Sequence, residues 1–178
     1  HIGNDHVVIA DAKRGDIGNT GLHYANAFFN HFNCDAITVS PYMGEESIEP
    51  FISNPSKGAY VLCRTSNKSS TFIQEEIYSK VISLCEALNN QQNIGLVVGA
   101  TNDDALMQVR NSTDLPFLIP GIGAQGGDLQ SVIKINENSM DTTLINVSRG
   151  IIFFGNKDYD SIRNSAKQYL NQLRGLNG

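Results

Sequence analysis

Four charged residues stand close together near the start of the sequence, in the segment Asp11-Ala-Lys13-Arg-Gly-Asp16. Asp11 and Lys13 are two positions apart, so on a strand their side chains project to the same face. Asp16 can return to them only through the following loop or from another subunit. An ammonium group between two carboxylates stays charged, because each opposite charge favours the ionised form. Such a lysine is suited to donate a proton rather than to accept one.

The elements that must position these charges alternate regularly along the chain. Short apolar or β-branched runs predict six strands, and the longer segments between them have helical period. This alternation predicts parallel strands joined by right-handed crossovers. The expected strands are 6–11, 36–40, 59–63, 94–98, 117–120 and 143–147, and the expected helices are about 21–33, 44–53, 71–90, 102–111, 126–136 and 158–174.

Polar residues follow the carboxyl end of nearly every expected strand. Asp11, Lys13 and Asp16 follow the first strand, and the segments 40–42, 64–67 and 99–102 follow the next three. A closed barrel gathers such ends into one ring, whereas an open sheet concentrates its ligand at one switch point. We therefore favour a (β/α)8 TIM barrel over an open six-stranded sheet.

The number of strands is two short of a complete barrel. Phosphate sites in such barrels commonly follow the seventh and eighth strands, whereas the phosphate-like loops here follow the fifth and sixth. We expect the first two βα units to be missing, so that residues 1–178 form the C-terminal six βα units of a single barrel domain. His1 would then not be a true N-terminus.

The composition and net charge of the chain indicate which kinds of binding partner to expect. The chain has 178 residues, of which 40% are hydrophobic and 17% charged, as in one globular domain. The net charge of −5 argues against a general nucleic-acid or anionic-membrane surface. No apolar run has membrane length, and we expect a cytoplasmic protein. Three cysteines cannot all pair and lack metal-ligand spacing, so we expect reduced core residues and no metal site.

Residues 11–20, DAKRGDIGNT, resemble the Asp-x-Lys-x-x-Asp-Ile-Gly-Asn-Thr signature of the orotidine 5'-monophosphate decarboxylase family, in its longer, bacterial-type branch. The Asp-x-Lys-x-x-Asp part alone is shared with phosphosugar decarboxylases and aldolases. Four further motifs occur in the family's order and make the resemblance specific. They are Thr38-Val-Ser-Pro-Tyr-Met-Gly, Thr65-Ser66-Asn67, Pro120-Gly-Ile-Gly-Ala-Gln125-Gly-Gly-Asp and Asn146-Val-Ser-Arg149-Gly150-Ile.

The resemblance implies a carboxy-lyase that converts orotidine 5'-monophosphate (OMP) to UMP and CO2 in pyrimidine biosynthesis, without cofactor or metal. Lys13 would stabilise and then protonate the carbanion at pyrimidine C6, Asp11 would lie near the departing carboxylate, and Asp16 would orient Lys13. It also implies a homodimer with shared active sites. Asp16, Ile17 and Thr20 would come from the neighbouring subunit.

The other motifs would hold the rest of the nucleotide. The resemblance assigns the pyrimidine amide edge to Thr65 and Ser66, although a Thr-Ser pair after a strand is also a common cap or turn. It assigns the phosphate to Pro120, Gln125, Arg149 and Gly150. Glycines let backbone N–H groups approach a phosphate, and arginine grips one with its planar fork.

Two departures from the family pattern concern position 148 and the amino-terminal side. Ser148 stands where the family more often has glycine. A ribose-binding aspartate after the family's first strand and a lysine after its second are both absent from the 178 residues.

Two other functions stay open. The first is a phosphosugar decarboxylase or aldolase of the same barrel group, which would need acidic metal ligands near the strand ends. The second is a non-catalytic nucleotide-binding relative that keeps only the phosphate cradle. The intact set of Asp11, Lys13 and Asp16 argues against the second function.

Overall fold

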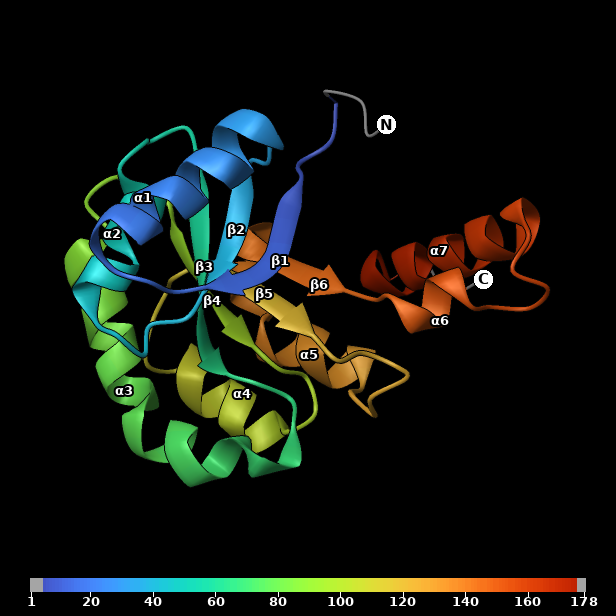
Figure 1. Ribbon diagram of the computed structural model, residues 1–178. Coiled ribbons are helices and arrows are strands. Elements are labelled where there is room, and N and C mark those ends of the chain that lie inside the picture. The colour runs from blue at the N-terminus through green and yellow to red at the C-terminus, as the bar shows by residue number, and fades with distance from the viewer. Residues whose placement is uncertain (1–4, 176–178) are drawn as a thin grey trace.

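The computed structural model describes residues 5–175 and contains one parallel sheet of six strands in the order β1-β2-β3-β4-β5-β6. Each strand pairs with the next one along the chain, as right-handed crossovers produce. Within the described residues, β1 and β6 each pair on one side only, so the curled sheet is open (Figure 1). The strands are β1 (Ile9–Arg14), β2 (Ala36–Val39), β3 (Gly58–Arg64), β4 (Ile94–Val98), β5 (Phe117–Pro120) and β6 (Thr143–Asn146).

Helices cover one face of the sheet, and the last two helices extend beyond β6 (Figure 1). Seven are α-helices: α1 (Gly18–Asn26), α2 (Glu49–Ile52), α3 (Thr71–Leu88), α4 (Asp103–Arg110), α5 (Leu129–Ile135), α6 (Arg149–Ile152) and α7 (Tyr159–Leu173). The others are the short turns η1 (Ala27–His31), η2 (Glu45–Ser47), η3 (Lys68–Ser70) and η4 (Glu137–Thr142).

The core lies between the sheet and these helices. Val61 in β3 and Ile119 in β5 face the helices and are fully buried. Each such side chain contributes about 1.5–3 kcal/mol through its removal from water. Neighbours on the opposite face are less covered: Leu62 is half-buried, and Leu144 in β6 is 42% exposed. This asymmetry is that of a barrel wall whose inner face is only partly filled, and it confirms the α/β class with a curled parallel sheet.

The first strand differs from its predicted position. Residues 6–11 were expected to form it, but β1 begins at Ile9 and ends at Arg14. Val7 is 74% exposed, and Val8 bonds instead to the segment before β2, through its N–H to the Asp35 carboxylate and its carbonyl to the Asp35 N–H. Asp11 and Lys13 therefore lie inside β1 rather than after it.

Three predicted helices also have different limits. The expected helix 21–33 begins at Gly18 and closes in the wider turn η1. The expected helix 44–53 is divided into η2 and α2, because Pro50 has no N–H for a continuous helix. The expected helix 126–136 begins only at Leu129, since Gly126 has a positive φ of 95° and Asp128 caps the helix.

The three cysteines are free and buried, as predicted for reduced core residues. Burial raises the pKa of the Cys63 and Cys85 thiols to about 12, so both remain protonated at neutral pH. None of the helices in the described part of the chain is both long and apolar enough to span a membrane.

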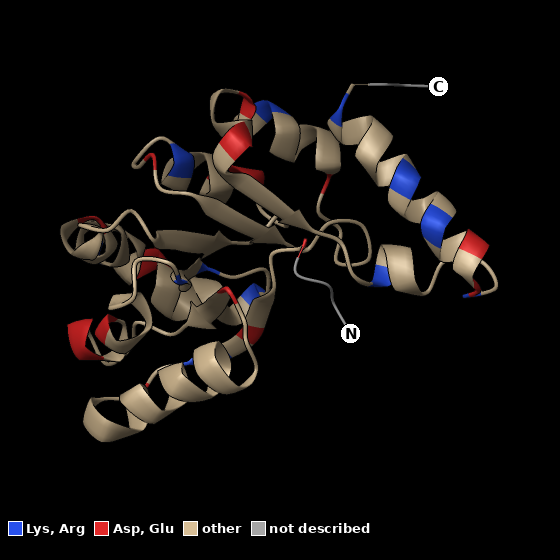
Figure 2. Ribbon diagram, turned by 90° about the horizontal axis from the view of Figure 1, so that it is seen from above, with Lys and Arg blue, Asp and Glu red and all other residues tan. Residues whose placement is uncertain are grey.

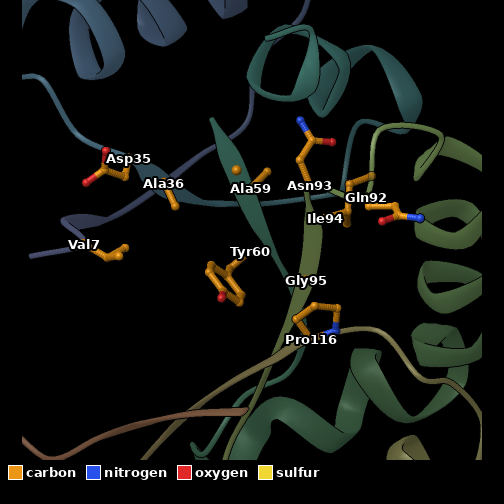
Figure 3. Close-up of a pocket in the computed structure, with 11 residues that line it drawn as sticks. Val7, Asp35, Ala36, Ala59, Tyr60, Gln92, Asn93, Ile94, Gly95 and Pro116 are labelled. Atoms are coloured by element: carbon orange, nitrogen blue, oxygen red, sulfur yellow. The ribbon is translucent and has the colours of Figure 1, made fainter. Parts of the chain in front are cut away.

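A hollow of about 180 Å³ opens at the amino-terminal end of the strands (Figure 3). The Tyr60 ring lies against Gly95 there, and a methyl group at position 95 would approach its Cε1 to 2.6 Å. Burial raises the pKa of the Tyr60 hydroxyl. None of the predicted site residues lines this hollow, which belongs to the end of the sheet opposite the predicted chemistry.

Candidate active site

The Lys13 ammonium group contacts the Asp11 carboxylate at 2.5 Å, as their spacing predicted. Both side chains are more than half exposed, at 51% for Lys13 and 64% for Asp11. An ion pair this open to water adds little to stability. The pair is, however, open to solvent at the carboxyl half of β1. Figure 2 shows that Lys, Arg, Asp and Glu are few along the strands of the sheet.

Thr38 in β2 joins the two charged residues. Its buried hydroxyl donates a hydrogen bond to Asp11 Oδ1 at 3.0 Å and accepts one from the Lys13 backbone N–H at 2.9 Å. Lys13 has a positive φ of 50°, and the register between β1 and β2 shifts at this point. Such a β-bulge re-aims side chains next to functional sites.

The next residues fasten the end of β1 to the end of β2. The Ser40 N–H donates to the Arg14 carbonyl at 2.7 Å, and a methyl group at Gly15 would lie 2.7 Å from the Ser40 carbonyl oxygen. Arg14 places its guanidinium 5.2 Å from the Tyr24 ring of α1. Of the two adjacent cations, only Lys13 therefore joins Asp11.

Asp16, Ile17 and Thr20 lie at the start of α1. The Asp16 carboxylate accepts a hydrogen bond from the Ile17 N–H at 2.8 Å, and within residues 5–175 it forms no ion pair with Lys13. Ile17 is 52% exposed, and Thr20 is also exposed. The chain thus brings Asp11 and Lys13 together, and it leaves Asp16 half-buried and Ile17 and Thr20 exposed, apart from this pair.

The segment after β3 meets the segment after β5 through Ser66 and Gln125. The Ser66 hydroxyl donates to Gln125 Oε1 at 2.7 Å, and Thr101 donates to the Ser66 carbonyl at 2.9 Å. Thr65 is bound by Gln74 of α3, which accepts from the Thr65 N–H at 2.7 Å and donates to its hydroxyl at 2.9 Å. Ser66 is therefore tied to the opposite loop, and Thr65 to a helix.

A hollow of about 380 Å³ lies beside this junction. Arg64 and Lys68 supply two positive charges, and no acidic residue lines it within the described part of the chain. Arg64 is buried, and its Nη1 has no hydrogen-bond partner among residues 5–175. Hydroxyl and amide groups complete the lining, so the surroundings favour an anionic group. They include Thr65, Ser66, Asn67, Thr101, Asn102 and Gln125.

The glycines of residues 121–127, which we call the Gly123 loop, are required by the backbone. Gly121 has φ 105° and Gly123 has φ 71°, in the region that residues with a side chain rarely adopt. The Gly126 N–H closes a turn on the Gly123 carbonyl at 2.8 Å. Pro120 ends β5 opposite Asn146 of β6, so this loop starts beside the segment that follows β6.

Arg149 and Gly150 form the first turn of α6. Arg149 is exposed, whereas the Gly150 carbonyl accepts a hydrogen bond from the buried Ser165 hydroxyl of α7 at 2.8 Å. Since α6 follows β6 and the Gly123 loop follows β5, Arg149 and Gly150 lie at the same edge of the sheet as this loop.

Thr38 and Gln74 were missed as site residues by sequence reasoning. Thr38 stands in one of the motifs that carried the resemblance, and a buried threonine beside a charged strand was the available signal. No sequence pattern marks Gln74. Among residues 5–175, no three His, Cys, Asp or Glu side chains are grouped to hold a metal ion.

The sequence matches the family described as "Orotidine 5'-phosphate decarboxylase / HUMPS family" over residues 2–160. A curated orotidine 5'-phosphate decarboxylase of Dehalococcoides mccartyi strain CBDB1 is 47% identical over 159 residues, which are 83% of this chain and 59% of that protein. One from Halorubrum lacusprofundi is 44% identical over 166 residues, 86% of this chain and 59% of its own length.

Solved structures give the same relation. The OMP decarboxylase of Leishmania donovani aligns with a TM-score of 0.83 and 38% identity, covering 98% of this chain and 70% of that one. The UMP synthase of the same organism aligns with a TM-score of 0.85 and 40% identity, covering 98% and 40%. This chain spans about 59% of the length of the curated relatives. By sequence and by fold, it belongs to the orotidine 5'-phosphate decarboxylase / HUMPS family.

Proposed function

We propose that the protein of which this chain is part decarboxylates OMP to UMP and CO2. The observation that supports this most is the Lys13–Asp11 pair, joined by Thr38 at the carboxyl end of the sheet. The curated relatives bear the name of this enzyme. Its role in pyrimidine biosynthesis would place the protein in the cytoplasm.

The proposed decarboxylation needs a positioned cation with an anion beside it. The bond between C6 and the carboxylate carbon breaks, CO2 leaves, and the electron pair stays on C6. The Lys13 ammonium group stabilises this developing charge and then transfers a proton to C6, after which water reprotonates the amine. The Asp11 carboxylate contacts this ammonium group and lies beside the carboxylate that leaves.

The remaining residues would bind the parts of the nucleotide that do not react. Ser66 reaches the pyrimidine edge, with Thr65 beside it and held by Gln74. Gln125 and the backbone of the Gly123 loop, which follows Pro120, hold the phosphate from one side. Arg149 and Gly150 hold it from the other, because their segment starts at the neighbouring strand end.

Two further βα units would complete the barrel on the amino-terminal side. The open edges of β1 and β6 and the half-covered inner face support this, since unpaired edges expose backbone groups. The match covers 59% of the curated relative, so that relative has further residues from which such units could form. The ribose-binding aspartate and the second lysine expected for the family would then lie on them.

The complete protein would be a homodimer whose neighbouring subunit brings Asp16, Ile17 and Thr20 to the Lys13 site. The exposure of Ile17 and Thr20 at the start of α1 supports this arrangement. Apolar side chains are also exposed near the same edge, including Tyr42 at 81% and Phe72 at 87%. Both line one hollow, and adjoining exposed apolar side chains of this kind are typical of an interface.

The function is tested by substrate comparison on the complete protein. Incubation with OMP should reduce the orotidylate absorbance and form UMP in equal amount, without added metal. The family description also includes HUMPS, so a phosphosugar of the same group serves as the alternative substrate. Turnover of the phosphosugar in place of OMP would contradict the proposal, and UMP binding without turnover of either substrate would identify a non-catalytic relative.

A further inference from the structure

Helix α7 contacts both segments that we propose as the phosphate site. Ser165 and Tyr169 are four residues apart, so they share one face of the helix. The Ser165 side chain is 1% exposed, and its hydroxyl donates to the Gly150 carbonyl at 2.8 Å. Tyr169 is half-buried and packs against the core. Helix α7 is therefore held against the first turn of α6, next to Arg149.

The Tyr169 hydroxyl lies at the junction of the two segments. A methyl group at Gly150 would lie 2.6 Å from this oxygen, and one at Gly123 would lie 3.0 Å from it. The first distance is a clash and the second is tighter than ordinary contact. Both glycines therefore lie against the same hydroxyl group, although they follow different strands.

The Tyr169 hydroxyl is a contact that the two segments share. The Gly123 loop is otherwise held by bonds within itself, such as that between the Gly123 N–H and the Gly127 carbonyl at 3.1 Å, and by the Ser66–Gln125 bond to the segment after β3. The Ser165 bond holds only the Gly150 side. Among residues 5–175, Tyr169 is thus the side chain that touches both glycines.

We propose that Tyr169 is a positioning residue for the phosphate of the substrate. Its hydroxyl sets the distance between the Gly123 loop and the Arg149 segment, so that donors from both reach one phosphomonoester. This inference rests on the proposed function, because it takes the phosphate to lie between these two segments. A small shift in a held group is enough to weaken binding strongly.

The test compares ligands with and without phosphate. Tyr169→Phe in the complete protein removes the hydroxyl and keeps the ring, so the fold and its melting temperature should be unchanged. Affinity for UMP should fall about tenfold, equal to about 1.4 kcal/mol, and affinity for uridine should stay within about twofold. Tyr159→Phe is the matched control, because Tyr159 opens the same helix and is 75% exposed. It should change neither affinity.

A second variant pair tests the contact itself. Gly150→Ala should weaken UMP binding, because its methyl group meets the Tyr169 hydroxyl. In the Tyr169→Phe background the hydroxyl is gone, so the same substitution should cost less affinity, and the two changes should not add.

Three results would overturn the assignment of Tyr169: unchanged UMP affinity in Tyr169→Phe, equal losses for UMP and uridine, or strictly additive effects with Gly150→Ala. A wild-type protein that prefers UMP to uridine but does not decarboxylate OMP would overturn the proposed function and leave Tyr169 assigned. A wild-type protein with no such preference would overturn both.

Discussion

The unusual backbone conformation of Lys13 is stabilised by the side chain of Thr38. A positive φ in a lysine costs about 1–3 kcal/mol and persists only where neighbours hold it. The Thr38 hydroxyl does so by accepting from the Lys13 N–H while donating to Asp11. The bulge that aims the Lys13 side chain is thus held by the neighbouring strand.

We expect Thr38→Val to damage the site with moderate loss of stability. The new methyl group fills the space, but the Lys13 N–H and Asp11 lose a buried partner, which costs about 1–3 kcal/mol of unfolding free energy. The kcat of OMP decarboxylation should fall at least tenfold, because the ammonium group is no longer held in place.

Thr143→Val is the matched control for that substitution. Thr143 is a buried strand threonine whose hydroxyl donates to the Ser139 carbonyl at 2.7 Å, away from Lys13. It should lose comparable stability and keep kcat. Equal losses of kcat in the two variants would show that Thr38 acts only through the fold.

The sequence predicts this site in part. The two-residue spacing of Asp11 and Lys13 predicted their contact, since side-chain direction on a strand is local. The connection from Ser66 to Gln125 spans 59 positions and was not predicted. Such a bond depends on how two loops meet in space, and neither loop carries a local signal for the other.

At the scale of elements, three α-helices begin at a residue whose side chain accepts a hydrogen bond. Asn102 caps α4, Asp128 caps α5 and Asp158 caps α7. The Ser161 N–H, together with the Ser161 hydroxyl, lowers the pKa of Asp158 by bonding to its carboxylate. The cap of α7 therefore works as a charged group, and it fixes the helix that carries Tyr169.

The pH dependence of stability should report this cap. Since the folded-state pKa of Asp158 is below the ordinary value of 3.8, the stabilisation is fully present above that value and is lost as pH falls through the folded pKa. We expect Asp158→Ala to lower the melting temperature at pH 7, and the difference from wild type to shrink below about pH 3.8.

Asp160→Ala provides the comparison, because Asp160 lies in the same helical turn but is not the capping residue. Its effect on the melting temperature should be smaller. A difference for Asp158→Ala that stays constant down to the lowest measurable pH would contradict the charged cap.

The limits of the long helices could be predicted from the sequence, whereas those of the first strand and of the interrupted helices could not. The predictions for α3, α4 and α7 differ from the structure by at most two residues at either end, because all three are strongly periodic and a capping residue precedes α4 and α7. The first strand was placed three residues early, since Val7 and Val8 are as apolar as a strand requires. Val8 bonds instead to Asp35, which lies before the next strand, and Val7 is exposed.

At the scale of the whole molecule, two parts of the proposed site are incompletely covered: the inner face of the sheet and the start of α1. The inner face of the sheet is half-covered because β1 and β6 have one neighbour each within the described residues. At the start of α1, Ile17 and Thr20 are exposed, and the half-buried Asp16 bonds to the Ile17 N–H rather than to Lys13 of β1. Both features fit the longer, dimeric protein that we propose.

Mixing of inactive variants tests the shared site. Asp11→Ala and Asp16→Ala proteins should each be inactive alone, because each lacks one member of the charged set in both sites. Subunit exchange creates heterodimers in which one site carries both changes and the other is intact, so activity should return toward a quarter of wild type by random pairing.

Mass spectrometry of the mixture shows whether exchange has occurred. Exchanged samples without activity would mean that both aspartates come from one chain, and that the site is complete within a subunit.

The most direct test of the central claim is OMP decarboxylation by Lys13→Ala in the complete protein. The side chain is half exposed at the end of the sheet, so its removal should leave the fold intact while abolishing UMP formation. Lys57→Ala is the control, because Lys57 forms the other lysine–aspartate pair of the described residues, 3.7 Å from Asp35 at the opposite end of the sheet. We predict wild-type rates for Lys57→Ala and no detectable UMP from Lys13→Ala. A Lys13→Ala rate within about tenfold of wild type, a loss of at most about 1.4 kcal/mol of transition-state stabilisation, would show that Lys13 is not the proton donor.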